Sequence, residues 1–256
     1  MAPILHHRLQ GQGSPVVLIH GLFGSLENLG VLAKALSESY AVYSLDLPNH
    51  GRSPHSDSMT LGSMAADVER WMDEQSIQQA HFIGHSLGGK VAMELALKSA
   101  HRIKKLAVID IAPVRYEPHH TDIFAGLHAL DITNLSSRAV ADDFLHPYVP
   151  ELAIRSFLLK NLVKAESGFV WRMNLPAITK NYPSLIGANQ LGDTFKGEAL
   201  FLKGGDSAYI QNDHKDDIAA RFPHAKLRII SGVGHWLHAE KPDHVAKILN
   251  TYLFDE

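Results

Sequence analysis

A serine lies between two glycines in residues 84–88, which read Gly-His-Ser-Leu-Gly and match the pattern G-x-S-x-G. An apolar, β-branched run precedes these residues and a helical pattern follows them, so they predict a tight turn from a strand into a helix. Glycines on both sides of the serine avoid collisions between strand and helix, and the turn exposes the hydroxyl. The helix N-terminus behind it favours developing negative charge. The pattern therefore predicts that Ser86 is a nucleophile.

A nucleophilic serine needs a base, and the base needs an acid that orients it. His235 is the candidate base because it follows the last apolar strand in a glycine-bearing loop. The carboxyl ends of parallel strands meet at one edge of a sheet, which would bring His235 close to Ser86. Two aspartates, Asp110 and Asp206, each follow an apolar strand. The residues alone leave both of them open as the acid.

Acyl chemistry at a serine also needs two preorganised N–H donors for the oxyanion. The backbone amide of Leu87 is one candidate, since it directly follows the nucleophile. The second candidate is the amide of Leu22 or Phe23, in the glycine-bearing loop after the first buried strand. For His85, we expect a side chain that faces away from the nucleophile and contacts this first loop.

The elements that would position these residues alternate along the chain. Continuous apolar strands alternate with amphipathic helices, which indicates an α/β fold with a mostly parallel sheet and helices on both faces. These strands are expected at 16–19, 41–45, 80–83, 106–109, 199–202 and 227–230, with a plausible edge strand at 4–9. In the loop 46–53, Asp46, Asn49 and Arg52 are expected to hold a structural turn by hydrogen bonds.

The alternation stops in the middle of the chain. Residues 114–191 offer helical pieces and no convincing strand; the pieces lie at 123–130, 139–145 and 154–162. We interpret this segment as a helical cap inserted into one core domain. The core would then comprise residues 1–113 and 192–256.

The composition narrows the possible partners. The 256 residues carry a net charge of −3 and no block of Lys or Arg, so neither nucleic acid nor an anionic membrane surface is expected as a partner. The chain has no cysteine, no apolar run long enough to cross a membrane and no signal-like pattern in residues 1–10, which favours the cytoplasm. The 17 histidines include no helical His-x-x-x-His pair with a catalytic Glu, so no metal is expected. The oligomeric state is not indicated.

Five motifs in order resemble the α/β-hydrolase superfamily along essentially the whole chain. They are His20-Gly21 and residues 46–53, 84–89, 110–113 and 234–236. More narrowly, residues 22–29, 109–113 and 235–242 look like the small bacterial carboxylesterases of the YbfF type. This resemblance implies ester hydrolysis through an acyl-serine intermediate, without a cofactor, beneath a helical cap.

The resemblance also bears on the acid. In much of the superfamily the acid lies three residues beyond the glycine that ends the penultimate strand. Here Ser207 holds that place and Asp206 comes one residue early. Some members take the acid from the preceding strand, as the YbfF type does, and this favours Asp110.

Aromatic side chains predict an apolar pocket suited to a short or medium acyl chain. The candidates are Phe23, Phe124, Phe144, Tyr209 and Trp236. The leading prediction is a carboxylesterase. A thioesterase, a carbon–carbon bond hydrolase or a perhydrolase could use the same residues, and a slow small-molecule receptor could retain them.

Overall fold

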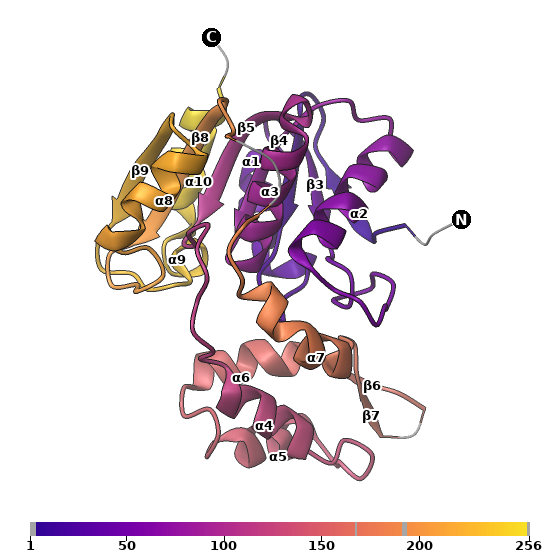
Figure 1. Cartoon of the computed structure of the whole chain (residues 1–256). Helices are drawn as coiled ribbons and strands as arrows, with labels where there is room; N and C mark the ends of the chain where they lie inside the picture. Colours follow the sequence, from indigo (N-terminus) through magenta and orange to yellow (C-terminus); the bar gives the residue numbers. More distant parts are fainter. Residues whose placement is uncertain (1–3, 167, 191–193, 255–256) are drawn as a thin grey trace.

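A twisted seven-stranded sheet forms the centre of the computed structural model, which describes residues 4–166, 168–190 and 194–254 (Figure 1). The strand order is β1-β3-β2-β4-β5-β8-β9; β1 runs antiparallel to β3, and the other pairs are parallel. The strands are β1 (His7–Gln10), β2 (Pro15–Ile19), β3 (Ala41–Leu45), β4 (Ala80–His85), β5 (Ile103–Ile109), β8 (Glu198–Gly204) and β9 (Ala225–Ile230). The α/β class and the mostly parallel sheet are thus confirmed.

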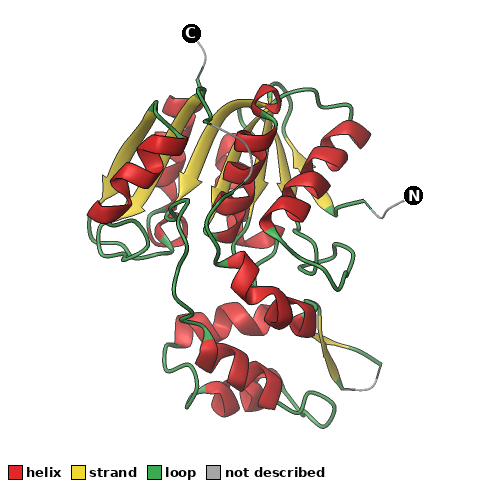
Figure 2. Cartoon of the chain, viewed as in Figure 1, coloured by secondary structure: helices red, strands yellow, loops and turns green. Residues whose placement is uncertain are grey.

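Helices cover both faces of this sheet (Figure 2). Val16 and Leu18 of β2 pack in one core and Val17 and Ile19 in the other, because successive side chains of a strand point to opposite faces. The first core includes α1 (Gly30–Leu36) and α10 (Pro242–Leu253), and the second includes α2 (Leu61–Glu74), α3 (Leu87–Lys98) and α8 (Lys215–Arg221). Burial on both faces explains why the inner strands β2, β4 and β8 read as continuous apolar runs, whereas the edge strands β1 and β9 are largely exposed.

The segment between β5 and β8 lies beyond the carboxyl ends of the strands (Figure 1). It contains α4 (Thr121–Ala129), α5 (Arg138–Leu145), α6 (Leu152–Leu158), η3 (Leu159–Asn161), β6 (Leu162–Lys164), β7 (Phe169–Trp171) and α7 (Leu175–Leu185). The sequence prediction of a segment without strands was wrong, since β6 and β7 form an antiparallel hairpin. Strands of three residues are too short to show a period of two. The helix expected at 154–162 ends at Leu158, and α7 was not predicted.

The predicted domain limits at residues 1, 191, 192 and 256 lie outside the described residues. Within the described ranges, no helix is both long and apolar enough to cross a membrane.

The loop after β3 forms the expected turn around one carboxylate. Asp46 accepts hydrogen bonds from the amides of Leu26 (2.7 Å) and Arg52 (2.8 Å), and the Asn49 side chain accepts one from the amide of Ser56 (2.8 Å). Arg52 therefore contributes its backbone and not its guanidinium. These bonds tie the loop to the 3-10 helix η1 (Leu26–Leu29), which follows the first glycine loop.

Candidate active site

Ser86 stands on a strained turn between β4 and α3, with φ 52° and ψ −118°. A methyl group on Gly84 would lie 2.3 Å from the carbonyl oxygen of Gly88, and one on Gly88 would lie 2.2 Å from that of Ile19. Both contacts are far inside van der Waals distance, so glycine is required on both sides. The turn leaves the serine half-buried and facing the main cavity.

The base and one candidate acid meet at the same edge of the sheet. The Nδ1 atom of His235 lies 2.8 Å from Oδ2 of Asp110, which is fully buried. Asp110 follows β5 at φ 53°, and its other oxygen accepts a hydrogen bond from the amide of Gly204 at 3.0 Å. Because Nδ1 is engaged by the carboxylate, Nε2 of His235 is the nitrogen left for proton transfer.

The second candidate acid lies elsewhere. Asp206 is exposed, its amide donates to the carbonyl of Val233 at 3.0 Å, and no hydrogen bond joins its carboxylate to His235 among the described residues. The geometry therefore brings Asp110, and not Asp206, to the imidazole. A one-residue displacement in this tight turn suffices to direct the side chain away from the sheet edge.

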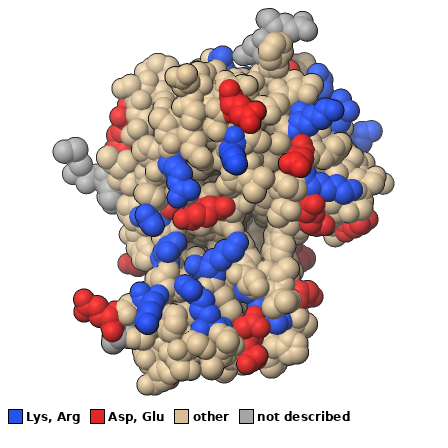
Figure 3. Space-filling model, turned by 180° about the vertical axis from the view of Figure 1, so that it is seen from behind, with Lys and Arg blue, Asp and Glu red and all other residues tan. Residues whose placement is uncertain are grey.

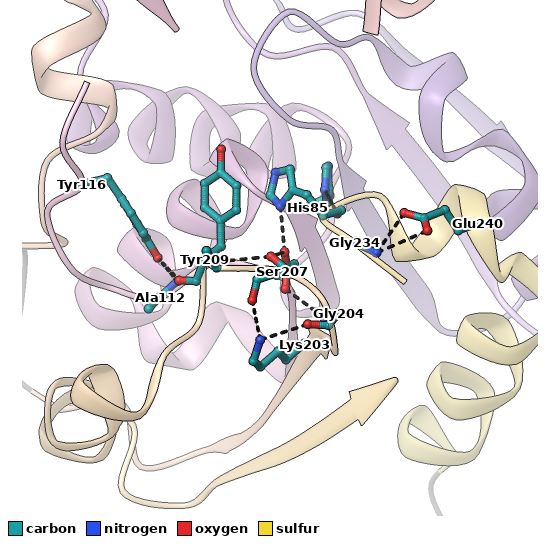
Figure 4. A network of polar contacts seen from close by, with 12 residues as sticks. His85, Ala112, Tyr116, Lys203, Gly204, Ser207, Tyr209, Gly234 and Glu240 are labelled. Carbon is teal, nitrogen blue, oxygen red and sulfur yellow. Dashed lines mark hydrogen bonds and ion pairs between the residues drawn. The ribbon is translucent and has the colours of Figure 1, made fainter. Parts of the chain in front are cut away.

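Ser207 occupies the position at which the acid lies in much of the superfamily. Its hydroxyl donates to Oδ2 of Asp110, and it accepts a hydrogen bond from the amide of Tyr209 at 3.2 Å. Lys203 secures the turn by donating to the carbonyls of Gly204 (3.0 Å) and Ser207 (2.5 Å), as Figure 4 shows. The sequence reasoning did not assign Ser207 a role. The serine at the superfamily's usual acid position was the signal that could have found it.

Two side chains hold the imidazole of His235 in place. The Tyr209 ring stacks on it with a centroid distance of 3.8 Å and an angle of 19°. His85 donates from Nε2 to the carbonyl of His235 at 3.0 Å, and its ring also packs against Gly21 of the first loop. The expectation for His85 was therefore incomplete, because its hydrogen-bond partner is the base's own backbone.

Ser86 and His235 line one cavity of about 750 Å³. Within the described residues no hydrogen bond joins the two side chains. In the absence of substrate, such contacts are often long or poorly aligned and tighten only in the complex.

Two backbone amides in this cavity are suited to an oxyanion. Leu87 is the first residue of α3, and the first amides of a helix have no partner within it. The amide of Phe23 is occupied, since it donates to Nε2 of His50 at 3.2 Å. The amide of Leu22 has no hydrogen-bond partner in the described part of the chain. Of the two candidates in the first loop, Leu22 is thus the free donor.

The predicted pocket aromatics divide into two groups. Phe23, Tyr209 and Trp236 line the cavity. Phe124 packs edge-on against Phe23 at 5.2 Å and Phe144 is 39 % exposed, and neither is among the residues that line the cavity. Helical spacing shows that a face is apolar but not what that face contacts. The apolar lining that the prediction missed includes Ile123, Ile154, Phe157, Leu185 and Ile186.

Several histidines around the cavity are held neutral by burial. Desolvation lowers the pKa of His20 to about 4, of His50 to about 3, of His120 to about 3 and of His238 to about 4. Burial also places the pKa of His85 well below its ordinary value. Across the described ranges, no group of three or more His, Cys, Asp or Glu side chains is arranged to hold a metal ion.

Comparison with known proteins places this geometry in a family. The protein-family model described as alpha/beta hydrolase fold matches residues 14–242 of this chain. The chain belongs to the α/β-hydrolase family. This α/β-hydrolase is 42 % identical to esterase YbfF of Escherichia coli over 247 residues, which cover 96 % of this chain and 95 % of the relative.

Two further similarities extend beyond that bacterial protein. This α/β-hydrolase is 36 % identical to the sn-1-specific diacylglycerol lipase ABHD11 of Danio rerio, with coverage of 94 % of this chain and 78 % of the relative. Among solved structures it resembles a marine microorganism esterase, with a TM-score of 0.96, 36 % identity, and coverage of 98 % of this chain and all of the other.

Proposed function

We propose that this carboxylesterase-type hydrolase cleaves carboxylic esters through an acyl-serine intermediate, with Ser86 as nucleophile, His235 as base and Asp110 as acid. One observation carries the proposal: His235 binds the buried Asp110 carboxylate through Nδ1 at 2.8 Å and lines the same cavity as the strained Ser86. The relatives named esterase support the reaction type.

The proposed reaction has two acyl transfers. His235 Nε2 removes the Ser86 proton as the serine oxygen attacks the ester carbonyl, and the imidazolium then protonates the departing alcohol. Water repeats the sequence on the acyl-enzyme and regenerates Ser86. Asp110 stabilises the imidazolium and keeps the Nδ1 proton directed toward itself, which fixes the tautomer.

The tetrahedral intermediates carry a negative oxygen that needs donors. We assign this role to the amides of Leu22 and Leu87, which both border the cavity. The N-terminus of α3 adds a favourable dipole at the same point. Phe23 is excluded as a donor because its amide is bound to His50.

Residues 114–191 would act as a cap over a core made of residues 1–113 and 192–256. Support for this division comes from the position of α4 to α7 beyond the sheet edge and from the cavity residues they contribute, such as Ile123, Phe157 and Leu185. Apolar walls and a volume of about 750 Å³ fit a short or medium acyl chain better than a polar substrate.

The test is covalent labelling with a fluorophosphonate, together with hydrolysis of p-nitrophenyl esters and matched thioesters of graded chain length. Wild type should be labelled and should hydrolyse the esters, while Ser86→Ala should do neither and keep the wild-type circular dichroism spectrum. Wild-type protein that resists the probe and shows no Ser86-dependent rate would overturn the proposal in favour of a binding role. Faster turnover of thioesters than of esters would contradict the ester assignment.

A further inference from the structure

Two connections join the segment 114–191 to the sheet, and they run side by side. The outgoing connection (residues 113–116) follows β5, and the return connection (residues 186–190) follows α7. The amide of Tyr116 donates to the carbonyl of Ile186 at 2.9 Å, and the amide of Asn189 donates to the carbonyl of Pro113 at 3.3 Å. The connections thus form a paired hinge between the two parts of the molecule.

A buried lysine bridges this hinge. The ammonium of Lys90 is 2.6 Å from the carbonyl oxygen of Val114 and 2.6 Å from that of Gly187, one on each connection. It also lies 5.0 Å from the centroid of the Tyr116 ring. Only 2 % of Lys90 is exposed, so its side chain lies inside the protein among these partners. A charged group is rarely buried to this degree unless its donors are satisfied.

Helix α3, which carries Lys90, binds the return connection at further points. The side-chain amide of Asn189 donates to the carbonyl of Lys90 at 2.8 Å and to a carboxylate oxygen of Glu94 at 2.7 Å. The amide of Gln190 donates to the same Glu94 oxygen at 3.3 Å. Helix α3 therefore binds the hinge through the side chains of Lys90 and Glu94, which lie one helical turn apart.

The hinge is also a wall of the cavity. Tyr116 and Ile186, which pair across the two connections, line the cavity together with Lys90. The amide of Lys90 donates to the carbonyl of Ser86 at 3.1 Å, so the clamp begins one turn after the nucleophile. A change in the hinge must therefore alter the space next to the serine.

We propose that Lys90 is a positioning residue that clamps both connections to the helix carrying Ser86 and thereby sets the chain length of the acyl group the cavity admits. The chain-length part rests on the proposed function. The clamp itself does not, because it concerns hydrogen bonds that exist without substrate.

The protonation state does not decide whether the clamp exists. Burial lowers the pKa of Lys90 to about 7, with Glu94 opposing that shift and Arg221 adding to it. A neutral amine still carries two N–H groups, one for each carbonyl. The clamp needs two donors at one point, which an apolar side chain of similar length lacks.

The test compares Lys90→Met with Lys98→Met, a control on the same helix. Lys98 is partly exposed and pairs with Glu69 at 2.9 Å, away from the cavity. Hydrogen exchange reports on the hinge, because the amides of Tyr116 and Asn189 are its cross-links. In Lys90→Met these amides should exchange about tenfold faster or more, as expected when the two hydrogen bonds that hold the hinge are lost. In the control they should exchange as in wild type.

The second readout is kinetic. Across p-nitrophenyl esters from acetate to laurate, Lys90→Met should shift the preferred chain length and should raise KM for the wild type's best ester by a larger factor than it lowers kcat, while Lys98→Met should leave both as in wild type. Unchanged exchange, or an unchanged chain-length profile, would overturn the proposal. Lys90→Gln keeps two N–H donors on a shorter side chain, so its amide exchange and its chain-length profile should lie between those of wild type and Lys90→Met. This variant also tests the proposal if Lys90→Met does not fold. Absence of labelling in wild type would instead refute the proposed function, and the exchange result would still stand.

Discussion

Replacing Asp110 by asparagine keeps the size of the side chain, but it removes the charge and turns one acceptor oxygen into an NH₂ donor. The side chains have the same shape, and the carbonyl oxygen of an asparagine can still accept the amide hydrogen of Gly204. The NH₂ group then faces Nδ1 of His235 and the hydroxyl of Ser207, which both donate to Oδ2 in wild type. In the proposed transition state the imidazole becomes positive, so Asp110→Asn removes both the charge that stabilises it and the acceptor that fixes its tautomer.

The expected loss can be worked from the contact distance. Two unit charges 2.8 Å apart, at an effective dielectric constant of about 20, attract each other by about 6 kcal/mol. At 1.36 kcal/mol per factor of ten, this corresponds to a fall in kcat of about ten thousandfold. Complete burial of Asp110 argues against a much smaller value, because little water screens the pair.

The assay is steady-state hydrolysis of p-nitrophenyl acetate, with the rate of fluorophosphonate labelling as a second measure. Asp206→Asn is the matched control, since Asp206 is exposed and should leave kcat within about twofold of wild type. Circular dichroism should show that both variants fold. A loss of less than tenfold in Asp110→Asn, or a larger loss in Asp206→Asn, would refute the assignment.

Three further outcomes follow from the same contacts. Ser207→Ala removes a hydroxyl donor from Asp110 and should lower kcat about tenfold, far less than Asp110→Asn; an unchanged kcat would contradict this role. Burial lowers the pKa of His50 from 6.5 to about 3, so below pH 6.5 the unfolded chain takes up a proton at His50 and the folded protein does not. The free energy of unfolding, measured in urea, should therefore be lower at pH 5 than at pH 7, by about 2 kcal/mol for this residue. Equal values at the two pH would argue against it. Gly88→Ala places a methyl group 2.2 Å from a backbone oxygen and should lower the free energy of unfolding by about 3 kcal/mol. Gly30→Ala is the control, because no atom lies within 4 Å of the added methyl group. Equal melting temperatures for the two variants would refute the steric argument.

The residues of the sheet and the elbow could be predicted because their signals are local. A strand buried on both faces must be apolar at every position, and Val16, Leu18 and their neighbours show this directly. Gly84 is required by the carbonyl oxygen of Gly88, which the same turn brings within 2.3 Å, whereas Gly88 is required by the carbonyl oxygen of Ile19 on β2. The first constraint acts over a few residues, so the sequence carries it intact.

The remainder depends on contacts between distant parts of the chain. Asp110 and Asp206 each follow a strand, and only the tertiary structure decides that Asp110 reaches His235, which is 125 residues away. Helical spacing shows which face of a helix is apolar but not what that face contacts, and the tertiary structure leaves Phe124 and Phe144 out of the cavity lining.

By itself, the sequence determined the mostly parallel α/β core, the turn that carries Ser86 and the choice of His235 as the candidate base, because each follows from neighbouring residues. Only the tertiary structure decided which aspartate contacts His235, the contact of Ser207 with Asp110, and the burial of Lys90 between Val114 and Gly187. The physical reason is that a buried polar group takes its partners from whatever the fold packs around it. Those partners are up to 97 residues away for Lys90, where no local pattern records them.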